Sequence, residues 1–136
     1  MDCYPSDLPS EDDTDLRLMS VRCHFVVAAA LISQARTGDK VDEQLQQYLE
    51  TRRHISEFDT LFDAHFRNDP KSQIYPDLLA KLSTLFVFDF ESAVCLKSWD
   101  DLRHIIRKAR ICKDEMMYKA MGDCLLRSEA SGNGMY

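Results

Sequence analysis

The chain has 136 residues, the length of one ordinary domain, and apolar residues make up 45% of it, enough to form a core. Its net charge of −6 argues against direct binding of nucleic acid by the surface as a whole. Only four glycines and four prolines are present, and so few breakers favour long helices over many short strands.

The cysteines and the apolar runs bear on the compartment. Five cysteines, an odd number with no CxxC spacing, are typical of free thiols in a reducing compartment: Cys3, Cys23, Cys95, Cys112 and Cys124. No basic segment followed by an apolar stretch marks a secretory signal near residue 1. The most apolar run, residues 25–32, is too short to span a bilayer, so no membrane partner is expected.

An acidic lead-in is predicted over residues 1–12, followed by a first helix at 14–36. One apolar row in this helix repeats at alternating steps of three and four: Leu18, Val21, Phe25, Ala28, Ile32 and Ala35. A second row has the same steps: Met19, Cys23, Val26 and Ala30. Two rows give the helix apolar surface on more than one side, which predicts a helix packed between neighbours.

A turn separates the first helix from a second one, predicted at 40–67. Gly38 suits the left-handed position that often follows a helix, and Asp39 suits the next N-cap. The core side of the second helix is expected to carry six apolar residues: Leu45, Tyr48, Leu49, Ile55, Phe62 and Phe66.

Three further helices follow. A third is predicted at 77–97, with Pro76 suited to its first turn, and a fourth at 99–110, with Ser98 as its cap. Asp114 is suited to cap a fifth. The helical domain then covers 13–128, and residues 129–136 have no periodicity and are expected to be disordered.

The spacing of large and small residues resembles the tetratricopeptide repeat. Phe25, Ala28 and Ile32 follow the pattern of a first repeat helix, and Gly122 takes the small position of a later one, which predicts a close helix contact there. The predicted fold class is all-α, with antiparallel helix pairs forming a tetratricopeptide-like α-solenoid fragment. An ordinary helical bundle with coincidental spacing is the alternative. Because two and a half repeats are marginal alone, self-association or weak stability is expected.

Motifs for catalysis are missing from the sequence. It contains no glycine-rich phosphate loop, GxSxG or HExxH. His54 and Glu57 form only half of a di-metal helical motif, and surface histidines are the simpler interpretation. Adjacent Cys23 and His24 diverge by about 100° on a helix, which is poor geometry for a nucleophile and its base. We therefore expect no enzyme activity, catalytic residue, cofactor, metal or small-molecule substrate.

The fourth helix carries the best candidate for a binding surface. Arg103, Arg107 and Arg110 recur at steps of four and three, which places them on one face. This face is either a solvated basic surface or a stripe that binds an acidic partner segment. Trp99 is either a core residue or a binding anchor. The predicted protein-binding residues are Trp99, Asp100, Arg103, Arg107 and Arg110.

An ordered set of segments across residues 2–128 carries a family resemblance. The segments are Tyr4-Pro5-Ser6-Asp7-Leu8, Cys23-His24-Phe25, Glu43-Gln44-Leu45-Gln46-Gln47-Tyr48-Leu49, Leu85-Phe86-Val87-Phe88-Asp89-Phe90-Glu91, Trp99-Asp100-Asp101-Leu102 and Tyr118-Lys119-Ala120-Met121-Gly122-Asp123-Cys124-Leu125-Leu126. Together they resemble the C-terminal part of the fungal sporulation-specific protein twenty-two, or Zip-four, family of meiotic tetratricopeptide scaffolds.

The resemblance implies a nuclear protein on meiotic chromosomes. Its expected role is a scaffold that supports crossover formation and synaptonemal complex assembly. The implied partners are meiotic crossover factors, chromosome-axis proteins and synaptonemal-complex proteins. In this family an aromatic residue followed by Asn is implicated in partner docking, and Trp99-Asp100 is the nearest match, with Asp in place of Asn. The alternative function is a generic helical-repeat adaptor without a meiotic role.

Overall fold

The structure, a computed structural model, describes residues 10–130. Its elements are α1 (Ser10–Thr37), α2 (Val41–His65), α3 (Tyr75–Cys95), α4 (Trp99–Ala109), the 3₁₀ helix η1 (Arg110–Cys112) and α5 (Glu115–Ala130). No strand occurs within these residues, so the predicted all-α class is confirmed. The lead-in and tail were predicted over 1–12 and 129–136. Residues 1–9 and 131–136 of these segments lie outside the described part.

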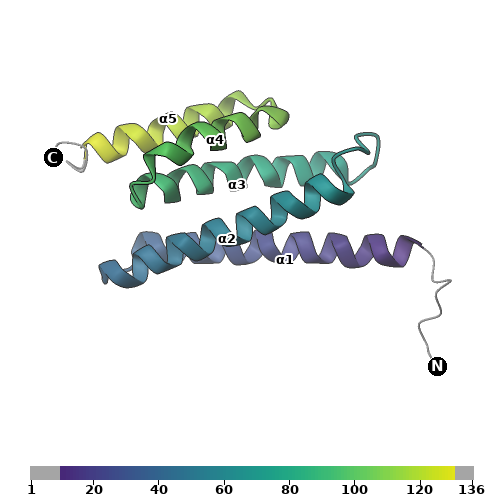
Figure 1. Ribbon diagram of the computed structural model, residues 1–136, viewed down its shortest axis with the longest axis horizontal. Helices are drawn as coiled ribbons and strands as arrows, with labels where there is room; N and C mark the ends of the chain where they lie inside the picture. Colours follow the sequence, from purple (N-terminus) through teal and green to yellow (C-terminus); the bar gives the residue numbers. More distant parts are fainter. Residues whose placement is uncertain (1–9, 131–136) are drawn as a thin grey trace.

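The helices are stacked in layers with α3 at the centre. Figure 1 shows α1 and α2 on one side of α3, α4 and α5 on the other, and consecutive helices running in opposite directions. Helix α3 packs against α1, α2, α4 and α5. The composition of α3 explains its position, because apolar residues occur on most of its circumference and such a helix is stable only between neighbours.

The core is formed mainly by aromatic and branched side chains of α2 and α3. Its largest fully buried members include Phe58, Phe62, Phe86, Phe90, Ile55, Leu78, Leu82 and Leu85. The predicted core row of α1 is also confirmed, since Val21, Ala28, Ile32 and Ala35 are buried. In α2 the prediction was wrong at Leu49, which is 51% exposed, and it missed Phe58. The actual register of α2 against α1 and α3 decided these two positions.

Two predicted helix starts have the expected chemistry. Pro76 lies in the first turn of α3, where its missing N–H costs no hydrogen bond. The Oδ1 atom of Asp114 accepts hydrogen bonds from the backbone N–H groups of Met116 (3.0 Å) and Met117 (3.3 Å), which caps α5. Ser98 occupies the N-cap position of α4 but makes no side-chain cap bond.

The turn between α1 and α2 differs from the prediction. The N-cap of α2 is Lys40 rather than Asp39, and Gly38 is not in the left-handed region. A Cβ atom at Gly38 would lie 3.0 Å from Cγ of Gln44. The Gln44 amide donates to the carbonyl oxygen of Ala35 (2.9 Å) and so satisfies the end of α1. A side chain at position 38 would therefore crowd Gln44, whereas the backbone conformation there does not require glycine.

The predicted close helix contact at Gly122 is wrong, and this leads to a stability prediction. A Cβ atom at Gly122 would meet nothing within 4 Å apart from its own helix. Alanine loses less backbone entropy in a helix interior, so Gly122→Ala should raise the free energy of unfolding by about 0.5–1 kcal/mol. Urea denaturation of the two chains measures this difference. A destabilised variant would mean that α5 needs glycine at this position.

Candidate functional site

Helix α4 presents one continuous outward face. Its inner side is anchored by buried Ile105 and Ala109, and the predicted binding residues all lie outside: Trp99, Asp100, Arg103, Arg107 and Arg110. Trp99 is 48% exposed, so it is not a core residue. Ile106, which is 37% exposed, lies among the arginines and was not predicted as part of the face. We call Trp99, Arg103, Ile106, Arg107 and Arg110 the α4 face.

The arginines of the α4 face are electrostatically unsatisfied. Across residues 10–130, no ion pair or hydrogen bond involves the side chain of Arg103, Arg107 or Arg110. Two neighbouring exposed cations are paired: Arg67 with Asp63 (2.8 Å) and Lys108 with Asp59 (3.7 Å). The face therefore combines apolar contact area with three cations that are free to pair with an acidic group from another molecule.

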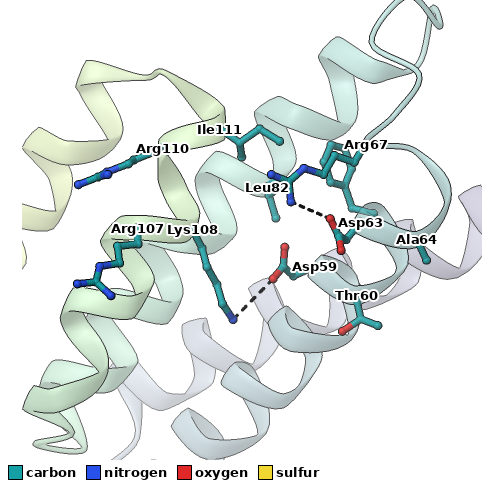
Figure 2. Close-up of a pocket in the computed structure, with 11 residues that line it drawn as sticks. Asp59, Thr60, Asp63, Ala64, Arg67, Leu82, Arg107, Lys108, Arg110 and Ile111 are labelled. Carbon is teal, nitrogen blue, oxygen red and sulfur yellow. Dashed lines mark hydrogen bonds and ion pairs between the residues drawn. The ribbon is translucent and has the colours of Figure 1, made fainter.

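A hollow of about 700 Å³ lies beside the α4 face, between the C-terminal half of α2 and α4 with η1. Figure 2 shows Asp59, Asp63 and Arg67 on one wall, and Arg107 and Arg110 extending away from these acids. Nζ of Lys108 lies 3.7 Å from Asp59. The pKa of Asp59 is raised, chiefly by burial, although Lys108 acts in the opposite direction. The acids of the hollow already have cationic neighbours, so they do not neutralise the outer arginines.

An ion-pair network that the sequence did not indicate holds α4 in place. Arg52 of α2 donates through Nε to Asp89 of α3 (2.6 Å) and through Nη1 to Asp101 of α4 (2.9 Å). Burial raises the pKa of Asp89, and Arg52 opposes that shift. One guanidinium thus joins three helices. Because the three residues come from separate segments and repeat no spacing, no sequence pattern could have identified them.

A backbone hydrogen bond fixes the turn between α3 and α4. Lys97 has a positive φ of 60°, and the N–H of Ser98 donates to the carbonyl oxygen of Ala93 (2.8 Å), which closes the end of α3. A shallow hollow of about 300 Å³ opens at this turn beside Trp99, Asp100 and Asp101. The indole of Trp99 therefore lies at the rim of a surface depression.

His54, interpreted from the sequence as a surface histidine, is half-buried and joins α2 to α1 through His24. Their Nδ1 atoms lie 2.9 Å apart, and both side chains are half-buried. Nε2 of His54 lies 3.1 Å from Nη2 of Arg53 and must accept, since a guanidinium only donates. The proton of His54 is therefore on Nδ1, where it is donated to Nδ1 of His24.

This geometry makes stability depend on pH. The pKa of His54 is lowered, first by burial and then by Arg53 and His24, with Glu50 and Glu57 opposing. A lowered pKa in the folded state stabilises the protein above the unfolded value of about 6.5 and loses that contribution as pH falls below it. The urea concentration at the midpoint of denaturation should decrease as the pH is lowered from about 7.5 to about 5.5. The decrease should be smaller in the His54→Gln variant. An equal fall in both chains would contradict this assignment.

The remaining candidate groups show no reactive cluster. Cys23, Cys95, Cys112 and Cys124 are free thiols. Cys124 is buried, whereas Cys95 is exposed at the end of α3. Burial raises the pKa of Cys112 to about 11, which keeps it protonated. Within residues 10–130 no three His, Cys, Asp or Glu side chains are placed to hold a metal ion.

One helix has the length and composition of a membrane span. Residues Thr14–Thr37 of α1 are long and apolar enough to cross a bilayer, although the run considered in the sequence, 25–32, is not. The same helix packs along α2 and contacts α3, and Val21, Ala28, Ile32 and Ala35 of its inner row are buried there. It would have to leave the core before it could cross a bilayer.

Comparison with known proteins identifies no relative. No family model matches this chain, and no curated protein or solved structure is significantly similar to it. The candidate site therefore rests on the residues themselves: three unpaired arginines, an exposed tryptophan and an isoleucine, on a helix that an internal ion-pair network holds against the core.

Proposed function

We propose that this chain is a non-catalytic, tetratricopeptide-like scaffold that binds another protein through the α4 face. The observation that carries the proposal is the combination of a half-exposed Trp99 with three arginines that have no partner in the described residues. Tryptophan and arginine are the residue types most enriched among those that dominate binding energy at protein interfaces. A purely solvated helix face has no need of an exposed tryptophan and isoleucine.

The packing order supports the repeat-like architecture in this proposal. In an α-solenoid each helix pair stacks on the next. Here α1 packs on α2, α2 on α3 and α3 on α4, and the first helices of successive pairs also meet, as α1 with α3 and α3 with α5. A bundle closed around a single core would instead bring α1 and α2 against α5.

The partner and the setting are proposed from chemistry and resemblance together. Three cations beside apolar side chains suit an acidic protein segment with its own apolar residues. The resemblance to meiotic scaffolds supports a nuclear role in crossover formation and synaptonemal complex assembly. Crossover, chromosome-axis and synaptonemal-complex proteins are then the partners to test. A generic adaptor would bind through the same face outside meiosis.

Trp99→Ala tests the anchor. With the indole half exposed, we expect less than about 1 kcal/mol loss of folding stability but about 2 kcal/mol, or roughly 30-fold, loss of partner affinity. Calorimetric binding and thermal melting of the same samples separate the two effects. Met116→Ala, at a residue 70% exposed on α5, is the matched control and should bind normally. Equal binding by the two variants would refute the anchor.

Charge reversal tests the arginines independently. Arg103→Glu with Arg107→Glu should abolish co-precipitation of meiotic axis and synaptonemal-complex proteins, while Lys71→Glu with Lys119→Glu makes the same charge change at exposed sites elsewhere. Retained binding in the arginine variant would mean that the stripe is only a solvated face. Location of the tagged chain on meiotic chromosomes separates the meiotic role from the generic adaptor.

A further inference from the structure

The C-terminal part of the α4 face carries two adjacent cations. Arg107 lies in the last turn of α4, and Arg110 begins η1. The backbone N–H of Arg110 donates to the carbonyl oxygen of Arg107, and the φ of −58° and ψ of −29° at Arg110 are helical. The two exposed side chains therefore project from one face, with Cβ atoms about 5–6 Å apart. We call Arg107 and Arg110 the arginine pair.

The sequence around the arginine pair offers no counter-charge. A helical residue can pair with residues three or four positions away. None of the four residues so placed around Arg107 is acidic: Arg103, His104, Arg110 and Ile111. Around Arg110 the one acid so placed is Asp114. Its Oδ1 atom caps α5, and its Oδ2 atom accepts a hydrogen bond from the hydroxyl of Ser83 (2.7 Å), so both of its oxygens are already bound.

The acids on the far wall of the hollow do not neutralise the arginine pair either. Asp63 accepts a hydrogen bond from Arg67 (2.8 Å), and Asp59 lies 3.7 Å from Nζ of Lys108. Figure 2 shows both side chains of the arginine pair extending to the side away from these acids. Four cations and two carboxylates line the hollow, so two positive charges, those of the arginine pair, are left at its outer rim.

Two adjacent, unpaired guanidinium groups match a phosphate better than a carboxylate. Each guanidinium can donate two parallel N–H bonds to one anion. A carboxylate carries one negative charge, so it balances one arginine of the pair and leaves the second unbalanced. A phosphorylated side chain has three free oxygens and a charge of roughly −1.5 to −2 at pH 7. It can therefore balance both arginines and accept hydrogen bonds from each.

We propose that the arginine pair binds a phosphorylated serine or threonine of the partner protein. The inference rests on the proposed function, because it specifies the acidic segment that the α4 face binds. Trp99 and Ile106 beside the arginines suit apolar residues next to the phosphate, which favours a protein over a nucleic acid, as does the net charge of −6. Phosphorylation of the partner then controls docking, because the unmodified segment leaves one arginine unbalanced.

Fluorescence polarisation with three labelled peptides tests this inference on the full chain. The peptides share one acidic sequence with a leucine on each side of a central residue, which is phosphoserine, serine or glutamate. At about 0.15 M salt, the chain should bind the phosphoserine peptide at least about tenfold more tightly than either of the other two. Equal affinities for the three peptides would overturn the inference.

Substitutions of the arginine pair separate its geometry from its charge. Arg107→Gln with Arg110→Gln should reduce the affinity for the phosphoserine peptide to that for the serine peptide. Arg107→Lys with Arg110→Lys keeps the charge but removes the planar forks, so it should lose most of the preference for phosphoserine. Lys71→Gln with Lys119→Gln removes the same charge at exposed sites elsewhere and should retain the preference. An undiminished preference in either variant of the arginine pair would contradict the assignment.

Failure of this inference is distinguishable from failure of the proposed function. If the phosphoserine and serine peptides bind equally and Trp99→Ala weakens both, the α4 face is a docking surface and only the phosphate inference is wrong. If no peptide binds, the phosphate inference is also wrong, and co-precipitation of the meiotic proteins tests the proposed function by itself. A short oligothymidylate that binds as tightly as the phosphoserine peptide would identify nucleic acid as the ligand and overturn the inference.

Discussion

Replacing Arg52 with alanine is expected to lower the free energy of unfolding by about 3 kcal/mol. The change leaves Asp89, whose side chain is only 14% exposed, without its cation, and an uncompensated buried charge is costly. The estimate is at the low end of the usual range because 24% of the Arg52 side chain remains exposed. Urea denaturation at pH 7 measures the loss. Since Arg52 also holds Asp101 of α4, partner binding should weaken in the same variant.

Two comparisons make the Arg52 prediction specific. Arg67→Ala removes an exposed i,i+4 pair with Asp63 and should cost no more than about 0.5 kcal/mol.

The pKa of Asp89 is already raised by burial, and removal of Arg52 raises it further. A raised carboxyl pKa means that stability is lost as pH rises above the unfolded value of about 3.9. Arg52→Ala should therefore lose less stability at pH 5 than at pH 7, and the opposite trend would contradict the network.

Phe90→Ala is expected to cost about 3–5 kcal/mol, the largest effect of any single change discussed. Phe90 is 1% exposed on α3, the helix that contacts all the others, so truncation leaves a cavity between the two outer layers. A loss of this size is a large part of the total stability of a small domain. Hydrogen exchange should show faster opening in α1 and α2 as well as in α4 and α5.

Leu49→Ala is the control for Phe90→Ala. Leu49 is apolar but 51% exposed on α2, and we expect a change within about 0.5 kcal/mol. A loss below about 1 kcal/mol for Phe90→Ala would mean that the core around α3 is loosely packed. A similar loss of stability in both variants would mean that Leu49 is covered by another helix. The α-solenoid proposal would then have to include that further helix packed against α2.

The sequence by itself determined the elements of this fold. Alternating steps of three and four in apolar residues predicted the helices, and Pro76 and Asp114 predicted two of their starts, because both signals act within one or two turns of chain. The same local information placed Arg103, Arg107 and Arg110 on one face of the predicted fourth helix, since helical spacing alone defines a face.

Only the tertiary structure decided which apolar rows are covered and which polar groups meet. Leu49 and the second apolar row of α1 (Met19, Cys23, Val26 and Ala30) have the spacing of core residues, yet they lie on the surface, because burial depends on where the neighbouring helices pack. The contacts of Arg52 with Asp89 and Asp101 join residues 37 and 49 positions apart, and the contact of His24 with His54 joins residues 30 apart. Helix periodicity reports only contacts within a few residues, so long-range pairs of this kind follow from the way α1, α2, α3 and α4 stack.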